Sequence, residues 1–155
     1  MKKFLLIYSI LITAVFGFYF LYKEHKAVPE SMEVGVVLAQ PEFLFKELND
    51  SILMLACEHY GLKEPKTVTA QAILETGWFR SKVFREYNNP FGLFNSRTMQ
   101  YFRFRHWSDA VIMYRDNIQK RLKRNEDYYN FLKRIGYAED EDYINKVKAL
   151  TDSLR

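Results

Sequence analysis

Residues 70–78, AQAILETGW, place a single carboxylate in a stretch that is otherwise apolar or small. The spacing predicts a short helix over about 67–79, in which Val68 lies on one stripe and Glu75 on the adjoining one. Gly77 is positioned to end that helix, since glycine readily adopts the conformation of a helix C-cap. The sequence therefore puts Glu75 in the last turn of a mostly apolar helix.

Two effects are expected to raise the pKa of Glu75. Trp78 and Phe79 follow three and four positions later and would remove water from the carboxyl group, and the end of the helix is negative. A carboxylic acid that stays protonated near neutral pH can protonate a glycosidic oxygen as it leaves. The alternative interpretation is an ordinary solvated glutamate on a helix surface.

Helical patterns occur on both sides of this stretch. We expect helices over about 41–60, from Ser108 as N-cap, over 127–135 before Gly136, and from about 140 onward. Between 80 and 106 the helical periodicity fails, and only 101–107, YFRFRHW, alternates like a strand. The predicted fold class is mainly α, with one small irregular or β lobe.

The composition excludes several classes of protein. The 155 residues are 48% hydrophobic, which suits one globular core and argues against a disordered chain. A single cysteine, Cys57, cannot form an intramolecular disulfide, and none of the three histidines has metal-ligand spacing. Neither glycine-rich phosphate-binding motif is present. We therefore expect neither a metal nor a cofactor.

The first 26 residues have a different character from the rest. Residues 4–22 contain no charge, and 19 residues form a helix of roughly 28 Å, close to the roughly 30 Å of a bilayer core. Lys2 and Lys3 precede this segment, which predicts a cytoplasmic N-terminus and a following chain outside the cytoplasm. The expected arrangement is one N-terminal transmembrane helix that anchors the protein in the inner (cytoplasmic) membrane of the cell envelope.

A cleaved signal peptide is the alternative for this segment, although a cleavage site is hard to find in it. Residues 27–40 contain Pro29 and Gly35, lack periodicity and are predicted to be a linker. Residues 41–155 are predicted to be the catalytic domain. Export follows from either alternative.

Charge is concentrated in the middle of the chain. Residues 78–134 contain 13 basic and 5 acidic side chains, against a net charge of +4 for the whole chain. Such a segment could contact nucleic acid, acidic lipid or an anionic polymer, or simply be a solvated helix face. Because export is expected, no nucleic acid partner is predicted.

Three blocks carry a resemblance to a known family. Residues 70–78 (AQAILETGW), 88–93 (NNPFGL) and 136–143 (GYAEDEDY) resemble, in order and spacing, the signature blocks of the glucosaminidase family, glycoside hydrolase family 73. This family comprises peptidoglycan-cleaving domains of autolysins and flagellar-assembly muramidases. Residues 106–111, HWSDAV, also fit, so the likeness spans about 43–150.

The resemblance implies a lysozyme-like helical domain that hydrolyses the β-1,4 bond after N-acetylglucosamine in peptidoglycan. Matching the blocks residue by residue makes Glu75 the general acid and Tyr137 the tyrosine that faces it. The implied substrate-binding residues flank or belong to the matched blocks, and they are Trp78, Asn89, Phe91 and Gly92.

The sequence departs from the family pattern at Pro90, Phe94 and Glu141. Between Thr76 and Ser108 the only carboxylate is Glu86, the possible second carboxylate of a two-carboxylate mechanism. A water positioned by Tyr137, or the acetamido group of the substrate, could replace it. The three alternatives stay open at this point.

Other activities also fit these residues. A lytic transglycosylase or a muramidase shares the fold and the single acid, and a non-catalytic cell-wall binding or assembly module would keep the cleft without turnover. The expected partners are peptidoglycan glycan strands, the membrane through residues 4–22, and possible proteins of the cell envelope. Arg97, Arg103 and Arg105 either contact carboxylates of the peptide stems or form a solvated strand edge.

Overall fold

The computed structural model describes residues 40–154, which form mainly helices and one two-stranded sheet. In chain order the elements are η1 (Glu42–Phe45), α2 (Asp50–His59), α3 (Pro65–Thr76), α4 (Lys82–Tyr87), β1 (Phe94–Asn95), β2 (Gln100–Tyr101), α5 (Trp107–Asn117), η2 (Gln119–Arg121), α6 (Tyr128–Ile135) and α7 (Tyr143–Ser153). This confirms a mainly α fold with a small β lobe, consistent with a lysozyme-like domain.

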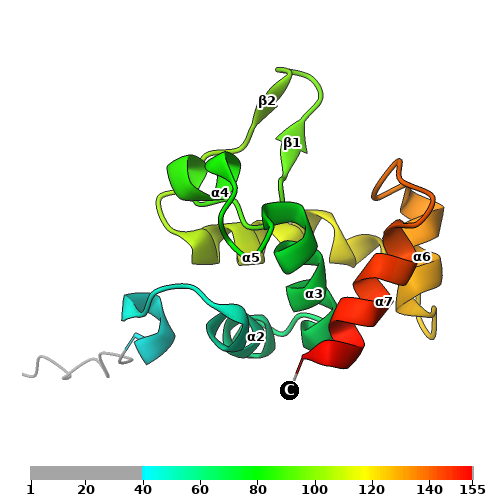
Figure 1. Cartoon of the computed structure of the whole chain (residues 1–155), viewed down its shortest axis with the longest axis horizontal. Helices are drawn as coiled ribbons and strands as arrows, with labels where there is room; N and C mark the ends of the chain where they lie inside the picture. The colour runs from blue at the N-terminus through cyan, green and yellow to red at the C-terminus, as the bar shows by residue number, and fades with distance from the viewer. Residues whose placement is uncertain (1–39, 155) are drawn as a thin grey trace, which may run out of the picture. The chain divides into compact units, whose positions relative to one another are not determined.

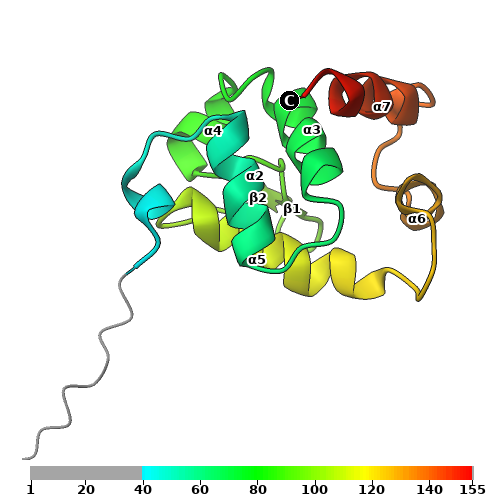
Figure 2. The same ribbon diagram turned by 90° about the horizontal axis from the view of Figure 1, so that it is seen from below.

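Helix α3 lies at the centre of these helices, with α2 on one side and α7 on the other (Figures 1 and 2). Pro65 occupies its first turn, where a missing N–H costs nothing, and Gly77 caps its end with φ of 54°. Most of its residues are buried on every side, and they are Thr67, Val68, Thr69, Ala70, Gln71, Ala72, Ile73 and Thr76. A helix buried all round is held rigidly by its neighbours.

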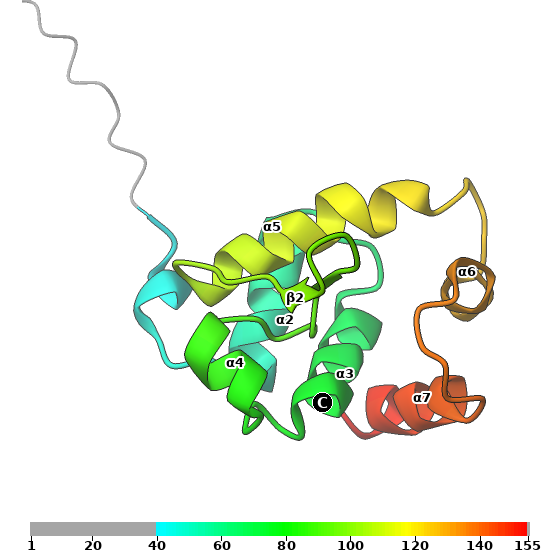
Figure 3. The same ribbon diagram turned by 90° about the horizontal axis from the view of Figure 1, so that it is seen from above.

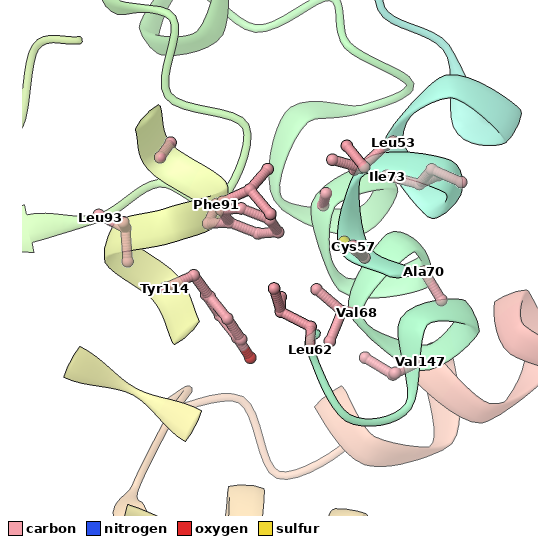
Figure 4. Packing of buried hydrophobic residues seen from close by; sticks show 14 of the residues in the cluster. Leu53, Cys57, Leu62, Val68, Ala70, Ile73, Phe91, Leu93, Tyr114 and Val147 are labelled. Atoms are coloured by element: carbon pink, nitrogen blue, oxygen red, sulfur yellow. The ribbon is translucent and has the colours of Figure 1, made fainter. Parts of the chain in front are cut away.

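The hydrophobic core joins α3 to the helices around it (Figure 4). Leu53 and Cys57 of α2 and Val147 of α7 are fully buried beside it. On the opposite side, the ring of Phe91 packs against Tyr114 of α5 with centroids 4.6 Å apart. The core therefore reaches the loop that precedes the sheet.

The β lobe is a hairpin that projects away from the helices between α4 and α5 (Figures 1 and 3). Its antiparallel strands pair Phe94 with Tyr101 and Asn95 with Gln100. The alternation over 101–107 predicted a longer strand, and this prediction is wrong beyond Tyr101. After Tyr101 the backbone pairs with other segments, since Phe104 N–H donates to the carbonyl of Tyr87.

Several helices differ from the prediction in their bounds or their presence. The single helix expected over 41–60 is broken, because the extended Asn49 caps α2 by accepting a hydrogen bond from Ile52 N–H (2.9 Å). Helix α4 was not expected and is capped by Ser81. Helix α5 is capped by His106 rather than Ser108, in a reciprocal capping box with Asp109.

Helix α6 begins after Asp127 and ends before Gly136, as predicted. Among residues 40–154, no helix is both long and apolar enough to cross a membrane. The anchor predicted at 4–22 and most of the linker predicted at 27–40 lie outside the described residues.

Candidate active site

Glu75 lies in the last turn of α3, at the edge of a pocket of about 270 Å³. The pocket is lined by residues from α3, the loop before the hairpin, η2 and the end of α6, and these are Glu75, Phe91, Gly92, Leu93, Phe94, Ile118, Arg121, Ile135, Gly136 and Tyr137. Glu75 is the one carboxylate among them. The structure thus brings together Glu75, Phe91, Gly92 and Tyr137, four of the residues that the sequence singled out.

The carboxyl group of Glu75 is crowded although the residue as a whole is exposed. Burial of the carboxyl raises its pKa, and a hydrogen bond with the Tyr143 hydroxyl partly offsets that effect. The pKa responds to the groups that surround the carboxyl oxygens, whatever the exposure of the rest of the side chain. The expected direction of the pKa shift is confirmed.

Trp78, which the sequence predicted to cover the carboxyl group of Glu75, does not line the pocket. Its side chain is 53% exposed. Gly77, Trp78 and Phe79 all have positive φ angles, between 54° and 60°, and this tight turn directs the chain away from the pocket. Two of these residues carry side chains, which makes the turn strained.

Gly92 lies beside the carboxyl group of Glu75. A Cβ atom at this position would lie 3.5 Å from Glu75 Oε2, and the φ of Gly92 is +58°. The positive φ favours glycine here, and a larger side chain would extend toward the carboxyl group.

Asn89 holds this loop in place from inside the protein. It is fully buried, and its side-chain amide donates to the carbonyls of Leu93 (2.9 Å) and Phe102 (3.1 Å). Its amide oxygen accepts from Leu93 N–H (2.9 Å). Asn89 thus orders the pocket wall, and its side chain is not part of the pocket lining.

Tyr137 and Phe91 both line the Glu75 pocket. The Tyr137 hydroxyl donates to the carbonyl of Phe91 at 3.4 Å, and burial followed by the charges of Tyr143 and Glu75 raises its pKa well above the usual range. The hydroxyl is therefore protonated at neutral pH and can donate a hydrogen bond. Phe91 is only 2% exposed, which makes it a supporting residue more than a sugar platform.

Glu86 does not reach this pocket. It lies on α4, its side chain is 50% exposed, and it pairs with Lys82 at 3.9 Å. The three lobe arginines, Arg97, Arg103 and Arg105, are exposed and also absent from the lining. Arg103 stacks on the ring of Tyr87 at 3.8 Å.

A chain of buried polar groups runs from Glu75 into the core. Gln71, one turn before Glu75, donates to the Tyr143 hydroxyl (3.2 Å) and accepts from Tyr114 (2.9 Å). Tyr114 in turn bonds the hydroxyl of Tyr128 (3.0 Å), which accepts from Gln119 (2.9 Å). The chain fixes the Tyr143 hydroxyl, the group that lowers the pKa of Glu75.

Sequence reasoning missed Tyr143 and Arg121 at this site. Tyr143 ends the third family block, so its position in that block was the available signal. Arg121 belongs to a run of basic residues over 120–124, and nothing in that run distinguishes it from a solvated helix face.

A larger hollow of about 660 Å³ lies elsewhere, between the start of α3, η2 and α6. Its lining includes the cations Lys63, Lys120, Lys123 and Arg124 and the acids Glu64, Glu126 and Asp127. In residues 40–154, no group of three or more His, Cys, Asp or Glu side chains is arranged to hold a metal. The smaller pocket is the candidate active site because it contains the carboxyl group with the raised pKa.

A helical domain with a single crowded carboxylic acid in a pocket is a typical arrangement for acid catalysis of glycosyl transfer. The chain belongs to the glucosaminidase family, whose model, described as mannosyl-glycoprotein endo-beta-N-acetylglucosaminidase, matches residues 51–155. This confirms the resemblance found in the sequence, and the family is one of glycoside hydrolases.

The solved structures similar to this chain include one from a type VI secretion system effector–immunity complex of Pseudomonas protegens. It is 14% identical, the match covers 66% of this chain and 88% of that one, and the TM-score is 0.49. No curated protein matches the chain.

Proposed function

We propose that this protein hydrolyses peptidoglycan glycan strands as an endo-β-N-acetylglucosaminidase, with Glu75 as general acid. One observation carries the proposal. The Glu75 carboxyl is the one acid in its pocket, and burial raises its pKa. Membership of the glucosaminidase family supports the bond type. The anionic character of peptidoglycan suits the basic middle of the chain.

In the first step the Glu75 carboxyl gives its proton to the glycosidic oxygen, and the bond from that oxygen to C1 breaks. The departing sugar leaves with a free hydroxyl group, and positive charge develops at C1. Tyr143 then donates a hydrogen bond to the carboxylate that Glu75 has become. Tyr137 also lines this pocket, and its hydroxyl group is protonated at neutral pH.

The second step needs a group that stabilises C1 and a base for water. Two-carboxylate mechanisms place the second group about 5 to 9.5 Å from the first. Glu86 is paired with Lys82 outside the pocket, which favours assistance by the acetamido group of the substrate. The carbonyl oxygen of the acetamido group forms a bond to C1 and closes a ring on the sugar. Water then attacks C1 and opens this ring, while the Glu75 carboxylate accepts a proton from the water.

The site also fits a lytic transglycosylase, because that reaction needs one acid and no external water. A wall-binding module is the alternative outside enzymes. We also propose, from residues 4–22, that the domain lies outside the cytoplasm and is anchored in the membrane.

The test is mass spectrometry of purified peptidoglycan digested by the full chain and then reduced with borohydride. Fragments with reduced N-acetylglucosamine ends are expected. Glu75→Gln should lower their rate of formation by at least about a hundredfold, the usual contribution of a general acid. Glu86→Gln is the matched control and should keep the activity.

Each other outcome points to another function. Reduced muramic acid ends would indicate a muramidase, and anhydro-muramic ends a transglycosylase. No fragments from a chain whose fold is verified by circular dichroism would contradict catalysis and favour the wall-binding module.

A further inference from the structure

Arg121 is the one cation among the residues that line the Glu75 pocket. It ends the short helix η2, where its N–H donates to the carbonyl of Ile118 (3.1 Å). Its own carbonyl accepts a hydrogen bond from the Arg134 guanidinium (2.9 Å). The backbone of Arg121 is therefore fixed from both sides, while its side chain is exposed.

Within residues 40–154 the guanidinium of Arg121 forms no ion pair, unlike those of two nearby arginines. Arg115 is paired with Asp116, and Arg134 is paired with Glu126. Arg121 thus presents an uncompensated positive charge at a pocket that holds a single acid.

Glu75 is not the partner of this charge. The two side chains form no ion pair among the described residues, and an adjacent guanidinium would lower the pKa of Glu75 rather than leave it raised. An acid that must stay protonated would lose its function beside a cation. The positive charge is therefore available for a group that enters the pocket.

We propose that Arg121 binds a carboxylate of the substrate, so that the pocket selects glycan strands with acidic substituents, such as the lactyl and peptide carboxylates of peptidoglycan. The proposal rests on the function proposed above and names the group that the pocket recognises. A guanidinium offers two parallel N–H donors that match the two oxygens of a carboxylate.

The experiment compares two forms of one substrate. Peptidoglycan fragments are assayed as prepared and after their carboxylates have been converted to amides, which removes the charge and keeps the glycan. Arg121→Gln should lower kcat/KM on the native fragments by about tenfold and leave that on the amidated fragments unchanged. The kcat/KM of Arg121→Lys on native fragments should lie between those of the wild type and Arg121→Gln, because lysine keeps the charge and loses the paired donors.

Lys120→Gln is the matched control. It removes the same charge from the neighbouring residue, whose side chain is exposed and lines the other hollow. It should leave kcat/KM unchanged on both forms. The wild-type preference for native fragments should also weaken as salt is raised, since the charges are near solvent.

An equal loss on both forms in Arg121→Gln, or no loss on either, would overturn the role of Arg121. If the wild type cleaves neither form, the proposed activity is wrong. Calorimetric binding of the same two forms then tests whether Arg121 contacts a carboxylate. Weaker binding of native fragments alone in Arg121→Gln would support the carboxylate contact, and equal binding would contradict it.

Discussion

Two carboxyl groups in two hollows of this domain have opposite environments. Glu75, in the smaller pocket, has a raised pKa and a tyrosine hydroxyl as its partner. Glu126, in the hollow of about 660 Å³, accepts hydrogen bonds from Arg134 (2.6 and 2.7 Å) and from Lys123 N–H (3.0 Å). These contacts lower the pKa of Glu126 to about 2.

Compensation of charge, more than the volume of the hollow, distinguishes the candidate acid in this protein. Glu126 is held ionised by its partners and ties the loop before α6 to that helix, so it has no proton to donate at neutral pH. Glu75 lies in the last turn of a largely buried helix and forms no ion pair among residues 40–154. Its proton is therefore available for transfer at a higher pH.

After the loss of Glu75 itself, the largest effect is expected from removing the Tyr143 hydroxyl group, which lowers the pKa of Glu75. Tyr143→Phe should lower kcat by about tenfold, because the carboxylate that forms after proton transfer loses its donor. The same bond lowers the pKa of Glu75, so its removal should raise that pKa further. The high-pH limb of the kcat profile, where the general acid loses its proton, should then move to higher pH.

Tyr128→Phe is the control for this prediction. Tyr128 belongs to the same hydrogen-bonded chain and lines the hollow of Glu126. Its loss should reduce the stability of the fold and leave the pH limb in place. A limb that moves equally in both variants, or in neither, would show that Tyr143 acts only through packing.

A smaller effect is expected from the two glycines at the Glu75 pocket. Both Gly92 and Gly136 line it, and both have φ near +60°, so alanine at either should cost about 1 kcal/mol of unfolding free energy. Only at Gly92 does the added Cβ meet the carboxyl, 3.5 Å from Oε2, whereas at Gly136 nothing lies within 4 Å.

Gly92→Ala should therefore lower kcat about threefold to fivefold, by narrowing the approach to Glu75, an effect of about 1 kcal/mol. Gly136→Ala should lose stability alone. Denaturant unfolding and steady-state rates measured on both variants separate the two effects. Equal rates would show that the space beside the carboxyl is not used by the substrate.

Local sequence patterns predict some of this fold well. Helix α6 is bounded by an aspartate cap and a glycine, and both signals act within the helix itself. The break at Asn49 and the short helix α4 also rest on local caps, since Asn49 accepts from Ile52 N–H and Ser81 accepts from Phe84 N–H. Single caps of this kind were overlooked because hydrophobic periodicity carries no trace of them.

The candidate site shows the same division. Glu75, Gly92 and Tyr137 come together as the family resemblance implies, although they lie far apart in the chain. Trp78 was expected beside Glu75 from helical spacing, but the helix ends at Thr76 and a left-handed turn carries Trp78 outward. Arg121 reaches the pocket only because η2 follows α5, which a run of basic residues does not reveal.

The smallest effects are expected in the thermal stability of variants at Glu75 and Glu126. The pKa of Glu75 in the folded protein lies above its unfolded value of about 4.3. The carboxyl group therefore stabilises the fold fully below about pH 4.3, and this contribution is lost as the pH rises through the folded pKa. Glu75→Gln should then raise the melting temperature at pH 7 by about 1 to 3 °C, a small shift because the residue is near solvent. At pH 4 the gain should vanish.

Glu126→Gln should show the opposite sign. The folded pKa of Glu126 is about 2, so its ionised form stabilises the fold above about pH 4.3, and this is lost as pH falls toward 2. Its replacement should lower the melting temperature at pH 7, with a difference that shrinks in acid. Scanning calorimetry at pH 3, 4 and 7 measures both variants. Shifts of the same sign would contradict the assignment of one carboxyl to proton transfer and the other to structure, since only opposite pKa displacements produce opposite pH dependences.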